Sequence, residues 1–304
     1  MQKFFALLMA LSLLALAACT ATGIASLGAT QCFTVEDTLP AVDHVPAKVV
    51  LLLGQSNATG VAANAYLQEK APAVYAEAAA GYDHVRINYV TENGGNSSQG
   101  RFVPVTMGQG ASADYFGPEL GMASLFSARY AGETVFILKY SWGGTILHNQ
   151  WLDGHARRGE LYTAAMAFCK TSLAYLTRVG YLPQVVAVCW MQGESDAVNA
   201  VMAKRYYKNT RALVGYLRAD LSDYTVEDFM FVDAGIAEVT YWTHYDVVNA
   251  AKQRYADEDA HAVYFDTQAM GLTTLGEPEG APDIAHYDAE SAYLLGREFA
   301  SHLG

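Results

Sequence analysis

The sequence predicts an α/β domain of three layers, in which helices cover both faces of a short parallel sheet. Near-continuous apolar runs of strand length favour parallel strands, because such strands are buried on both faces. These runs lie at 49–53, 134–140, 185–191, 229–232 and 262–265. Segments of helix length separate the runs, and this alternation is typical of a doubly wound sheet.

The segments between the strands carry helix signals. Pro118 suits the first turn of its helix, and Asp288 suits an N-cap position. Two further segments, 84–90 and 101–105, would add strands or a hairpin outside the main repeat. The expected helices occupy 118–130, 160–178, 196–221, 245–257 and 288–302.

The composition is that of a folded globular protein rather than a disordered one. Of the 304 residues, 52% are hydrophobic and 16% are charged. The formal net charge is −12 and the isoelectric point is near 5.0. This acidity argues against nucleic-acid binding, which favours a basic face. It names no substrate and mainly favours solubility.

The N-terminus predicts export. After Lys3, the run 4–18 is apolar except for Ser12. It is short for a transmembrane helix and has the length of a signal-peptide core. It ends in the sequence Leu16-Ala17-Ala18-Cys19, which resembles a bacterial lipobox, where the cysteine is lipidated. The alternative is an ordinary secretory signal that is cleaved at small residues.

These signals divide the chain into three parts. We expect a lipoprotein signal peptide at 1–18, a tether at 19–46 that begins with lipidated Cys19, and a folded domain at 47–304. The protein would then be a bacterial membrane-anchored lipoprotein that faces the periplasm or the cell surface. Its contact with the membrane would be through the lipid anchor alone.

Three cysteines remain if Cys19 carries a lipid. Since three is odd, at least one of Cys32, Cys169 and Cys189 should stay free. Cys169 and Cys189 could pair in an oxidising compartment, or both could be buried thiols. The spacing of cysteines and histidines suggests no metal site.

Polar motifs follow three of the predicted strands and precede the last helix. They lie at 54–57, 141–145, 190–196 and 283–287. Since parallel strands bring their carboxyl ends to one edge of a sheet, these segments can meet there. Two glycine-rich stretches, 92–110 and 141–159, are long loops, and the second directly follows a strand.

The motifs contain the groups that ester hydrolysis needs. The hydroxyl of Ser56 is a weak nucleophile and requires a base, which His286 can supply. Asp283, three residues before this histidine, can reach around a turn to its Nδ1 and stabilise the imidazolium. The oxyanion of a tetrahedral intermediate needs donors. Suitable donors are the backbone N–H groups of Ser56 and Gly144 and the side-chain amide of Gln192.

The order GQSN, GGT, WMQGES and DIAH resembles the SGNH-hydrolase superfamily. Within it, the chain is similar to the sialate O-acetylesterase and acetylxylan esterase group, carbohydrate esterase family six, from about residue 48 to 304. The resemblance implies a flavodoxin-like α/β/α fold, with Ser56 as nucleophile, His286 as base and Asp283 as acid. It also implies Gly144 and Gln192 as oxyanion donors.

Glu194 matches the glutamate of the QGE block, which some descriptions of the family treat as the acid partner of the histidine. We prefer Asp283, because its three-residue spacing holds it beside His286, and we expect Glu194 to have a supporting role. The chain departs from its relatives at Met191, where Tyr or His is common, and at Ile146, where Ser is common. These departures leave the exact substrate open.

The resemblance therefore implies hydrolysis of an O-acetyl ester on sialic acid, xylan or another acetylated glycan, with no metal or organic cofactor. Asn57 and Trp151 are candidate substrate contacts. The ring of Trp151 could stack on a sugar or pack within its loop. His148 and His155 are alternative bases or, more simply, surface or substrate-contact residues. The sequence does not predict an oligomeric state.

Two other functions compete with a carbohydrate esterase. A lipase or thioesterase on the same scaffold would show a long apolar groove near Trp142 and Trp151. A non-catalytic glycan-binding lipoprotein would keep Ser56 apart from His286. The α/β-hydrolase fold is disfavoured, because the G-x-S-x-G elbow is half met, with Ala58 in place of its second glycine.

Overall fold

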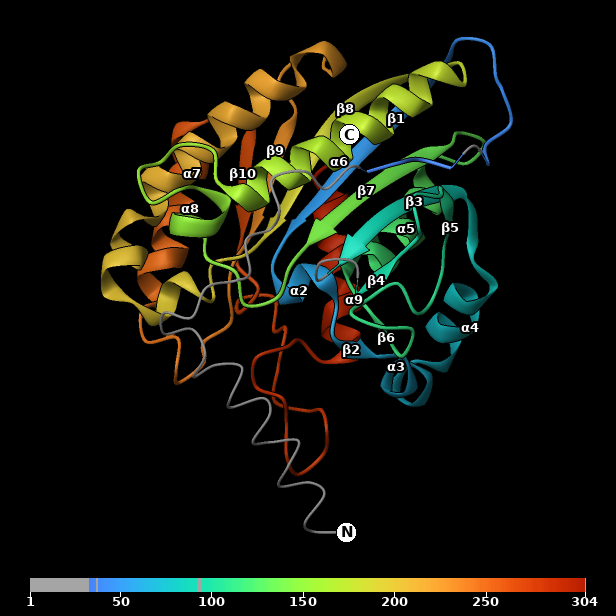
Figure 1. The fold of residues 1–304 in the computed structure, drawn as a ribbon. Coiled ribbons are helices and arrows are strands. Elements are labelled where there is room, and N and C mark those ends of the chain that lie inside the picture. The colour runs from blue at the N-terminus through green and yellow to red at the C-terminus, as the bar shows by residue number, and fades with distance from the viewer. Residues whose placement is uncertain (1–32, 37, 92–94, 304) are drawn as a thin grey trace. The chain divides into compact units, whose positions relative to one another are not determined.

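A central sheet organises the part of the chain that the computed structural model describes, residues 33–36, 38–91 and 95–303 (Figure 1). Eight strands of this part form the sheet, in the order β10-β9-β8-β1-β7-β3-β4, with β5 also paired to β3. Six of them are mutually parallel, and they are β1 (Val45–Gly54), β3 (Tyr82–Thr91), β7 (Val135–Ser141), β8 (Tyr181–Met191), β9 (Met230–Ala234) and β10 (Ala262–Phe265).

The order of the strands places a switch point at β1. From β1 the chain builds β3 and β7 on one side, and it then crosses to build β8, β9 and β10 on the other side. In open α/β sheets, ligands bind outside the carboxyl ends of the strands at such a point. The strand that carries GQSN at its end is therefore the one at which the topology opens a crevice.

One edge of the sheet differs from the sequence prediction. The segment 84–90 lies within β3, a parallel member of the main sheet, and not outside the main repeat. Strands β4 (Asn96–Ser97) and β5 (Val103–Val105) pair with it in antiparallel fashion. A separate small pair consists of β2 (Ala62–Ala63) and β6 (Tyr115–Phe116).

Helices cover both faces of the sheet, as α/β/α layering requires. Successive side chains of a strand point to opposite faces. On β7, Tyr140 packs against Phe168 of α6 (Glu160–Arg178), whereas Lys139 pairs at 2.7 Å with Glu119 of α5 (Pro118–Arg129). Helices α5 and α9 (Ala289–Ser301) cover one face of the sheet, and α6 and α7 (Ala200–Leu221) cover the other. Helix α8 (Tyr245–Glu258) packs on α7 and β10.

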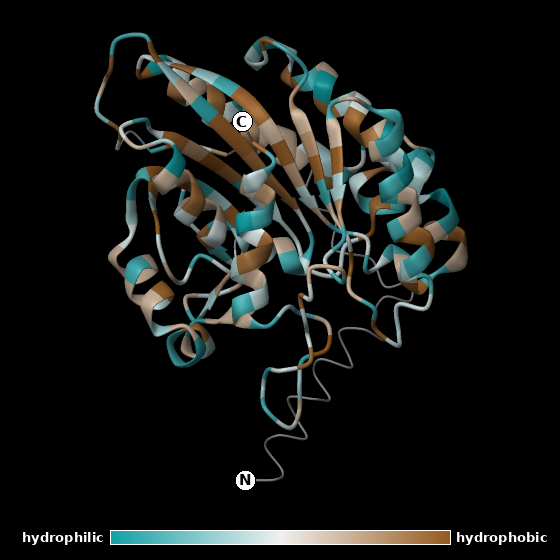
Figure 2. Cartoon of the chain, turned by 180° about the vertical axis from the view of Figure 1, so that it is seen from behind, coloured by the Kyte–Doolittle hydropathy of each residue, from teal (hydrophilic) through white to brown (hydrophobic). Residues whose placement is uncertain are grey.

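The hydropathy of the layers explains the arrangement (Figure 2). The strands are mostly brown, or hydrophobic, whereas the helices alternate between brown and teal residues. Each helix thus buries one side against the sheet and exposes the other. The free thiols of Cys169 and Cys189 are buried in these layers and do not pair, as in the simpler of the two expectations.

Most predicted helices form, with local differences. Helix α6 has the predicted bounds, and Pro118 lies in the first turn of α5. Residues 196–221 split into a 3₁₀ turn (Asp196–Val198) and α7, which Asn199 caps through Val201 N and Met202 N. Asp288 stands at the N-cap of α9, but its carboxylate accepts from Gly276 N instead. Three short helices were not expected, namely α2 (Ser56–Thr59), α3 (Asn64–Lys70) and α4 (Pro72–Ala80).

Part of the predicted tether belongs to the folded unit. Phe33 packs edge-on against Phe168 at a centroid distance of 5.5 Å, and the amides of Thr38 and Leu39 donate to Tyr175 Oη. The predicted signal peptide at 1–18 and Cys19 lie outside the described residues. Within those residues, no helix is both long enough and apolar enough to span a membrane.

Helices α5 and α9 cross at two glycines, and this crossing fixes the start of α9 next to the sheet edge. A Cβ at Gly121 would lie 1.9 Å from the carbonyl oxygen of Tyr293, and one at Gly296 would lie 1.9 Å from that of Pro118. The two backbones are thus in contact, with no room for a side chain between them. Since His286 lies just before α9, this packing also limits where the histidine can be.

We expect Gly296→Ala to lower the free energy of unfolding by about 1–3 kcal/mol, because the new methyl group must push the two helices apart. Gly215→Ala is the matched control. Gly215 lies inside α7, where an added Cβ would have no neighbouring atom within 4 Å, so alanine there should stabilise by about 0.5–1 kcal/mol. Urea unfolding of both variants tests this, and equal effects of the same sign would contradict the packing.

Candidate active site

The carboxyl ends of three adjacent strands bring the polar motifs together. In the register of the sheet, Gly54 of β1 lies opposite Ser141 of β7 and Met191 of β8. Backbone hydrogen bonds continue past the strand ends, from Gln55 N to Met191 O at 2.9 Å and from Trp142 N to Gly54 O at 3.1 Å. The three motifs therefore start from one place on the sheet edge.

The turn that presents Ser56 depends on Gly54. This glycine has φ +147°, and a Cβ on it would lie 1.9 Å from Met191 O. The end of β1 can thus lie directly against β8 before the chain turns into α2, which begins with Ser56. Ser56 is half-buried, and its Oγ has no hydrogen-bond partner in the described ranges.

His286 and Asp283 form a close pair. His286 Nδ1 lies 2.7 Å from Asp283 Oδ2, and the backbone N–H of Ala285 donates to Asp283 Oδ1 at 3.2 Å. Burial raises the pKa of the Asp283 carboxyl, but the hydrogen bond and the charge of His286 outweigh it, so the pKa lies below its usual value. The carboxylate is therefore ionised at neutral pH and can hold a proton on Nδ1.

Asn57 brings this pair to Ser56. Its side-chain amide donates to Ala285 O at 3.1 Å, and its Oδ1 accepts from Tyr287 N at 3.1 Å. The residue after Ser56 thus bonds to both neighbours of His286, although no hydrogen bond joins Ser56 Oγ to the His286 ring in the described residues. Asn57 is only 6% exposed and its amide is occupied within the protein, so little of its side chain is open to a substrate.

Glu194 lies beneath the site. It is 1% exposed, and its Oε1 accepts from Asn57 Nδ2 at 2.8 Å. Burial raises its pKa, against the opposing effects of the Asn57 hydrogen bond and the charges of Lys252 and His286. Among the described residues, the carboxylate that hydrogen-bonds to His286 is that of Asp283 and not that of Glu194.

The geometry does not fit the oxyanion role expected for Gln192. Its side chain is fully buried. Its Nε2 donates to Asp196 Oδ2 at 2.7 Å and to the carbonyl of Thr145 at 3.0 Å. These two acceptors occupy both N–H groups, so the amide holds the 141–159 loop against β8. The sequence motif identified a functional strand end, but it could not show which partners the amide takes.

Gly144 presents a backbone N–H that is open to a ligand. It is exposed and has φ +68°, and a Cβ added to it would have no neighbouring atom within 4 Å. The turn that contains it is closed by a hydrogen bond from Thr145 Oγ1 to Trp142 O at 2.8 Å. Its N–H has no acceptor within the described part of the chain, so it is available to a ligand.

Trp151 is a packing residue. It is fully buried, its ring meets that of Trp190 edge-on at 4.9 Å, and its indole N–H donates to Thr145 Oγ1 at 3.2 Å. A ring with no exposed face cannot stack on a sugar, so the burial of Trp151 fits the second alternative, packing within its loop. Met191 is fully buried as well, which means that this departure from the relatives does not touch a substrate.

The two alternative bases lie elsewhere in their loop. The ring of His148 contacts Arg205 Nη1 and Asn209 Nδ2, each at 3.3 Å, and burial with the charge of Arg205 lowers its pKa. The backbone N–H of His155 donates to Asp153 on the outer part of the loop. Neither ring hydrogen-bonds to Ser56 within the described chain.

Sequence reasoning missed Asp196, which clamps the loop. Its carboxylate accepts from Gln192, from Leu147 N at 2.8 Å and from His148 N at 3.2 Å. Burial raises its pKa to about 6 despite these hydrogen bonds. An aspartate that follows a strand is also typical of an ordinary helix start, so the sequence did not predict this role.

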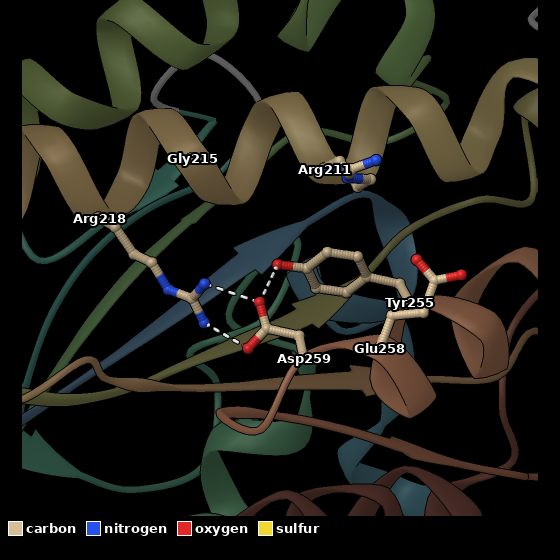
Figure 3. A pocket seen from close by; sticks show the side chains of 6 residues that line it. All are labelled: Arg211, Gly215, Arg218, Tyr255, Glu258 and Asp259. Carbon is tan, nitrogen blue, oxygen red and sulfur yellow. Dashed lines mark hydrogen bonds and ion pairs between the residues drawn. The ribbon is translucent and has the colours of Figure 1, made fainter.

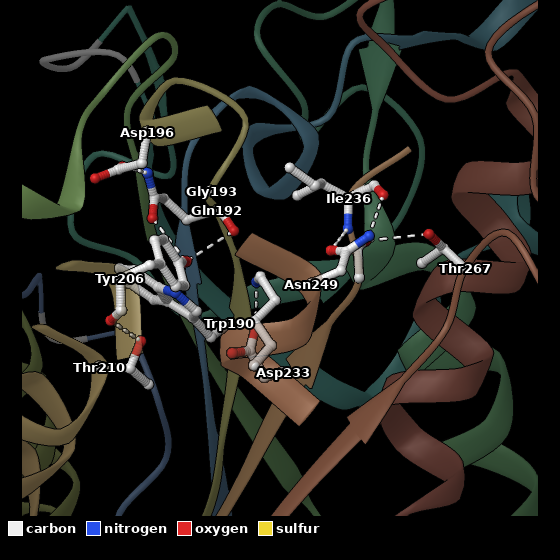
Figure 4. A network of polar contacts seen from close by, with 12 residues as sticks. Trp190, Gln192, Gly193, Asp196, Tyr206, Thr210, Asp233, Ile236, Asn249 and Thr267 are labelled. Carbon is white, nitrogen blue, oxygen red and sulfur yellow. Dashed lines mark hydrogen bonds and ion pairs between the residues drawn. The ribbon is translucent and has the colours of Figure 1, made fainter. Parts of the chain in front are cut away.

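A further network of buried polar groups supports the segment after β8 (Figure 4). Tyr206 Oη lies 3.0 Å and 2.9 Å from the backbone and side-chain oxygens of Gln192, and it accepts from Trp190 Nε1. Lys252 pairs with Asp233, and both are almost fully buried. Burial raises the pKa of Asp233 to about 6, although the charge of Lys252 lowers it. No periodicity in the sequence distinguishes Lys252 from a surface lysine.

A hollow away from the candidate site is a structural feature. A cavity of about 250 Å³ lies between α7 and α8 (Figure 3). In it, Arg218 donates to both oxygens of Asp259, at 2.7 Å and 2.8 Å, and Tyr255 Oη donates to the same carboxylate. Arg218 also lies 3.5 Å from Asp228, near the amino end of β9, whereas the candidate site is at the carboxyl ends. In the described residues, no cluster of three or more His, Cys, Asp or Glu could hold a metal ion.

Comparison with known proteins agrees with this geometry. The model of one protein family matches residues 46–303, and that family is described as carbohydrate esterase, sialic acid-specific acetylesterase. The chain belongs to this family. It is a carboxylic ester hydrolase of the carbohydrate O-acetylesterase kind. No curated protein matches the esterase significantly in sequence.

Solved structures share the fold of the esterase. A protein from Arabidopsis thaliana has a TM-score of 0.60 at 19% identity, over 84% of this chain and 96% of that one. NanS has a TM-score of 0.59 at 16% identity, over 86% and 97% of the two chains. A carbohydrate acetylesterase from Xanthomonas citri has a TM-score of 0.53 at 18% identity, over 84% of this chain and 54% of that one.

We expect Asp196→Ala to destabilise the esterase by about 2–4 kcal/mol, because several buried donors lose their acceptor. The amides of Leu147 and His148 should exchange their hydrogens faster with solvent. Asp153→Ala is the control, because Asp153 accepts hydrogen bonds on the outer part of the same loop. If exchange at Leu147 and His148 is unchanged in Asp196→Ala, Asp196 is not the clamp.

Proposed function

We propose that this esterase removes O-acetyl groups from an acetylated carbohydrate by a Ser-His-Asp mechanism. Ser56 Oγ attacks the carbonyl carbon of the acetyl group while His286 Nε2 takes the serine proton. Asp283 holds the proton on Nδ1 and offsets the charge of the imidazolium. The intermediate collapses, and the sugar oxygen leaves with the proton from His286. Water then attacks the carbonyl carbon of the acetyl-enzyme while His286 takes a proton from it. His286 returns this proton to Ser56 Oγ as the ester bond breaks, and acetate is released.

The observation that supports this assignment best is the connection among three groups. Asp283 lies 2.7 Å from His286 Nδ1, and Asn57 bonds to the residues on both sides of that histidine. A base must lie near its nucleophile and be oriented by a third group. Asp283 meets the second condition. No hydrogen bond joins Ser56 Oγ to the His286 ring in the described residues, and the support for their proximity is that Asn57, next to Ser56, bonds to both neighbours of the histidine. This arrangement supports a Ser-His-Asp mechanism. It also disfavours a purely glycan-binding role, which needs no such pair.

Two backbone amides suit the oxyanion. The N–H of Ser56 is at the first turn of α2, where N–H groups lack partners inside the helix. The N–H of Gly144 extends from the neighbouring strand end and is also free in the described residues. Donors of this kind act on the charge that develops in the transition state. We assign Gln192 to support of the Thr145 carbonyl, next to Gly144, rather than to direct donation.

Membership of the family supports an acetylated glycan as the class of substrate. The family description names sialic acid, and one structural neighbour is a carbohydrate acetylesterase. Because Trp151 is buried, it cannot help to form the long apolar groove that a lipase or thioesterase would need. We therefore propose acetyl esters of sialic acid, xylan or a related glycan, without a metal or organic cofactor.

We also propose that the esterase is exported and anchored by a lipid on Cys19. The support is the apolar run 4–18 followed by Leu16-Ala17-Ala18-Cys19 in the sequence. Such a lipid would keep the enzyme at the membrane surface of the periplasm or the cell exterior. It could then meet acetylated glycans that do not enter the cell.

Ser56→Ala should lower kcat for an activated acetyl ester by at least about 10⁴-fold, because the alanine side chain cannot form the acetyl-enzyme. Asp283→Asn should lower kcat by about 10²- to 10⁴-fold through loss of the oriented imidazole. Release of nitrophenol from nitrophenyl acetate measures both. Ser222→Ala, on the surface beyond α7, is the control that should keep full activity. A Ser56→Ala enzyme that keeps its activity would contradict the proposed mechanism.

Cys19→Ala should abolish incorporation of labelled palmitate when the full chain is expressed in a bacterial host. The chain that keeps Cys19 should take up the label and sediment with membranes, while the variant should not be labelled. Mass spectrometry of the mature N-terminus provides a second measurement. If the chain that keeps Cys19 yields a mature protein without a lipid, starting after a different cleavage site, the signal is an ordinary secretory one.

A further inference from the structure

We propose that Asn57 is a positioning residue that holds His286 against Ser56, and that Glu194 acts on the reaction by holding Asn57. This inference rests on the proposed function of the site. It assigns a role to two buried side chains that do not touch the reacting atoms. It also explains why residues on both sides of the nucleophile are polar although they are buried.

Asn57 bonds to the loop of the base at two points. One of its N–H groups donates to Ala285 O and its Oδ1 accepts from Tyr287 N, both at 3.1 Å. The two bonds bracket His286, so they restrict the rotation and the translation of its backbone at the same time. A carboxamide is planar and its atoms cannot move independently. The position of the histidine is thus tied to that of residue 57, and through one peptide bond to Ser56.

Asp283 cannot supply this restraint. It lies in the same loop as His286, so their 2.7 Å contact orients the ring relative to that loop but not relative to β1. Half of the Asp283 side chain is exposed, whereas Asn57 is almost fully buried. The loop runs from the end of β10 at Phe265 to the start of α9 at Ala289 and needs an anchor on the nucleophile side.

Glu194 sets the orientation of Asn57. Its Oε1 accepts from Asn57 Nδ2 at 2.8 Å. A carboxylate accepts hydrogen bonds, so it fixes the NH₂ end of the amide toward itself and Ala285, and the oxygen toward Tyr287. Gln55, with its amide nitrogen turned toward Glu194, donates to Oε2 at 3.1 Å. Both neighbours of Ser56 are therefore held by one buried carboxylate.

The bonding of Glu194 separates two possible roles. A carboxylate that served as the acid of the triad would bond to His286, but this bond is made by Asp283. Glu194 instead bonds to the residues that flank the nucleophile. Its charge lies near that of Lys252, which limits the cost of burying it. The geometry thus assigns Glu194 an effect that passes through Asn57.

The test is the steady-state kinetics of nitrophenyl acetate hydrolysis by substituted full-length enzymes. Asn57→Ala should lower kcat by about 10²-fold, because a misplaced catalytic group costs about that factor, and should leave KM within about threefold. Asn88→Ala is the matched control. Asn88 is also a buried asparagine with two side-chain hydrogen bonds, to Ser172 and from Ser98, but it lies within β3. It should lose stability without loss of kcat.

Substitutions of Glu194 test the second half of the proposal. Glu194→Gln keeps an oxygen that can accept from Asn57, so it should retain kcat within about tenfold. Glu194→Ala removes the acceptor and should resemble Asn57→Ala. In the double variant Asn57→Ala with Glu194→Ala, the loss should be no larger than in either single variant, because residues that act as one unit are not additive.

Three outcomes would overturn the inference. Asn57→Ala could keep kcat within threefold, Asn57→Ala and Asn88→Ala could lower kcat equally, or Glu194→Gln could lose as much as Asp283→Asn. The last result would make Glu194 a direct partner of the histidine. If Ser56→Ala stays active, the proposed function fails and this inference with it. If Ser56→Ala is inactive but Asn57→Ala is not impaired, only this inference fails.

Discussion

The contact between the end of β1 and the backbone of β8 is the constraint on which the site depends. A side chain on Gly54 would collide with Met191 O at 1.9 Å, so the two strands run together to their last residues. This close approach gives GQSN and QGE a common origin on the sheet edge. Since β7 continues on the other side of β1, the turn at Gly144 starts from the same place. The starting points of the segments that carry Ser56, Gly144 and Gln192 follow from this register.

Below that edge, the protein buries an unusual amount of charge. Glu194, Asp196, Asp233 and Lys252 are all nearly inaccessible to water. Such groups cost free energy unless each has partners, and a half-satisfied network is worse than an apolar core. Here Glu194 accepts from α2, Asp196 from the 141–159 loop and Asp233 from Lys252 of α8. One oxygen of Asp233, Oδ2, has no partner in the described residues. The carboxylates thus act less as members of stabilising ion pairs than as fixed hydrogen-bond acceptors that define the positions of loops.

The sequence predicted the parts of the site that depend on residue type and on strand ends. Apolar runs located the central strands, and the order of four motifs indicated Ser56, His286 and Asp283 at one edge. It could not decide the roles that depend on burial or on the choice of partner. Trp151 and Asn57 have side chains suited to sugar binding, yet both are buried, and the Gln192 amide is occupied by Asp196 and Thr145. These outcomes depend on packing between distant segments, which local patterns do not encode. The same limit explains β3, whose place in the main sheet depends on its pairing with β7.

The bond between Tyr287 and Asn57 joins residues that are 230 positions apart in the chain. Closing so long a loop carries an entropic cost that only the packing of the intervening layers can offset. Both halves of the site are therefore in place only after α9 has docked on α5. A partly folded chain contains Ser56 and Asn57 without the segment that carries His286 bound to them. The candidate site is thus a property of the finished fold and of no shorter stretch of the sequence.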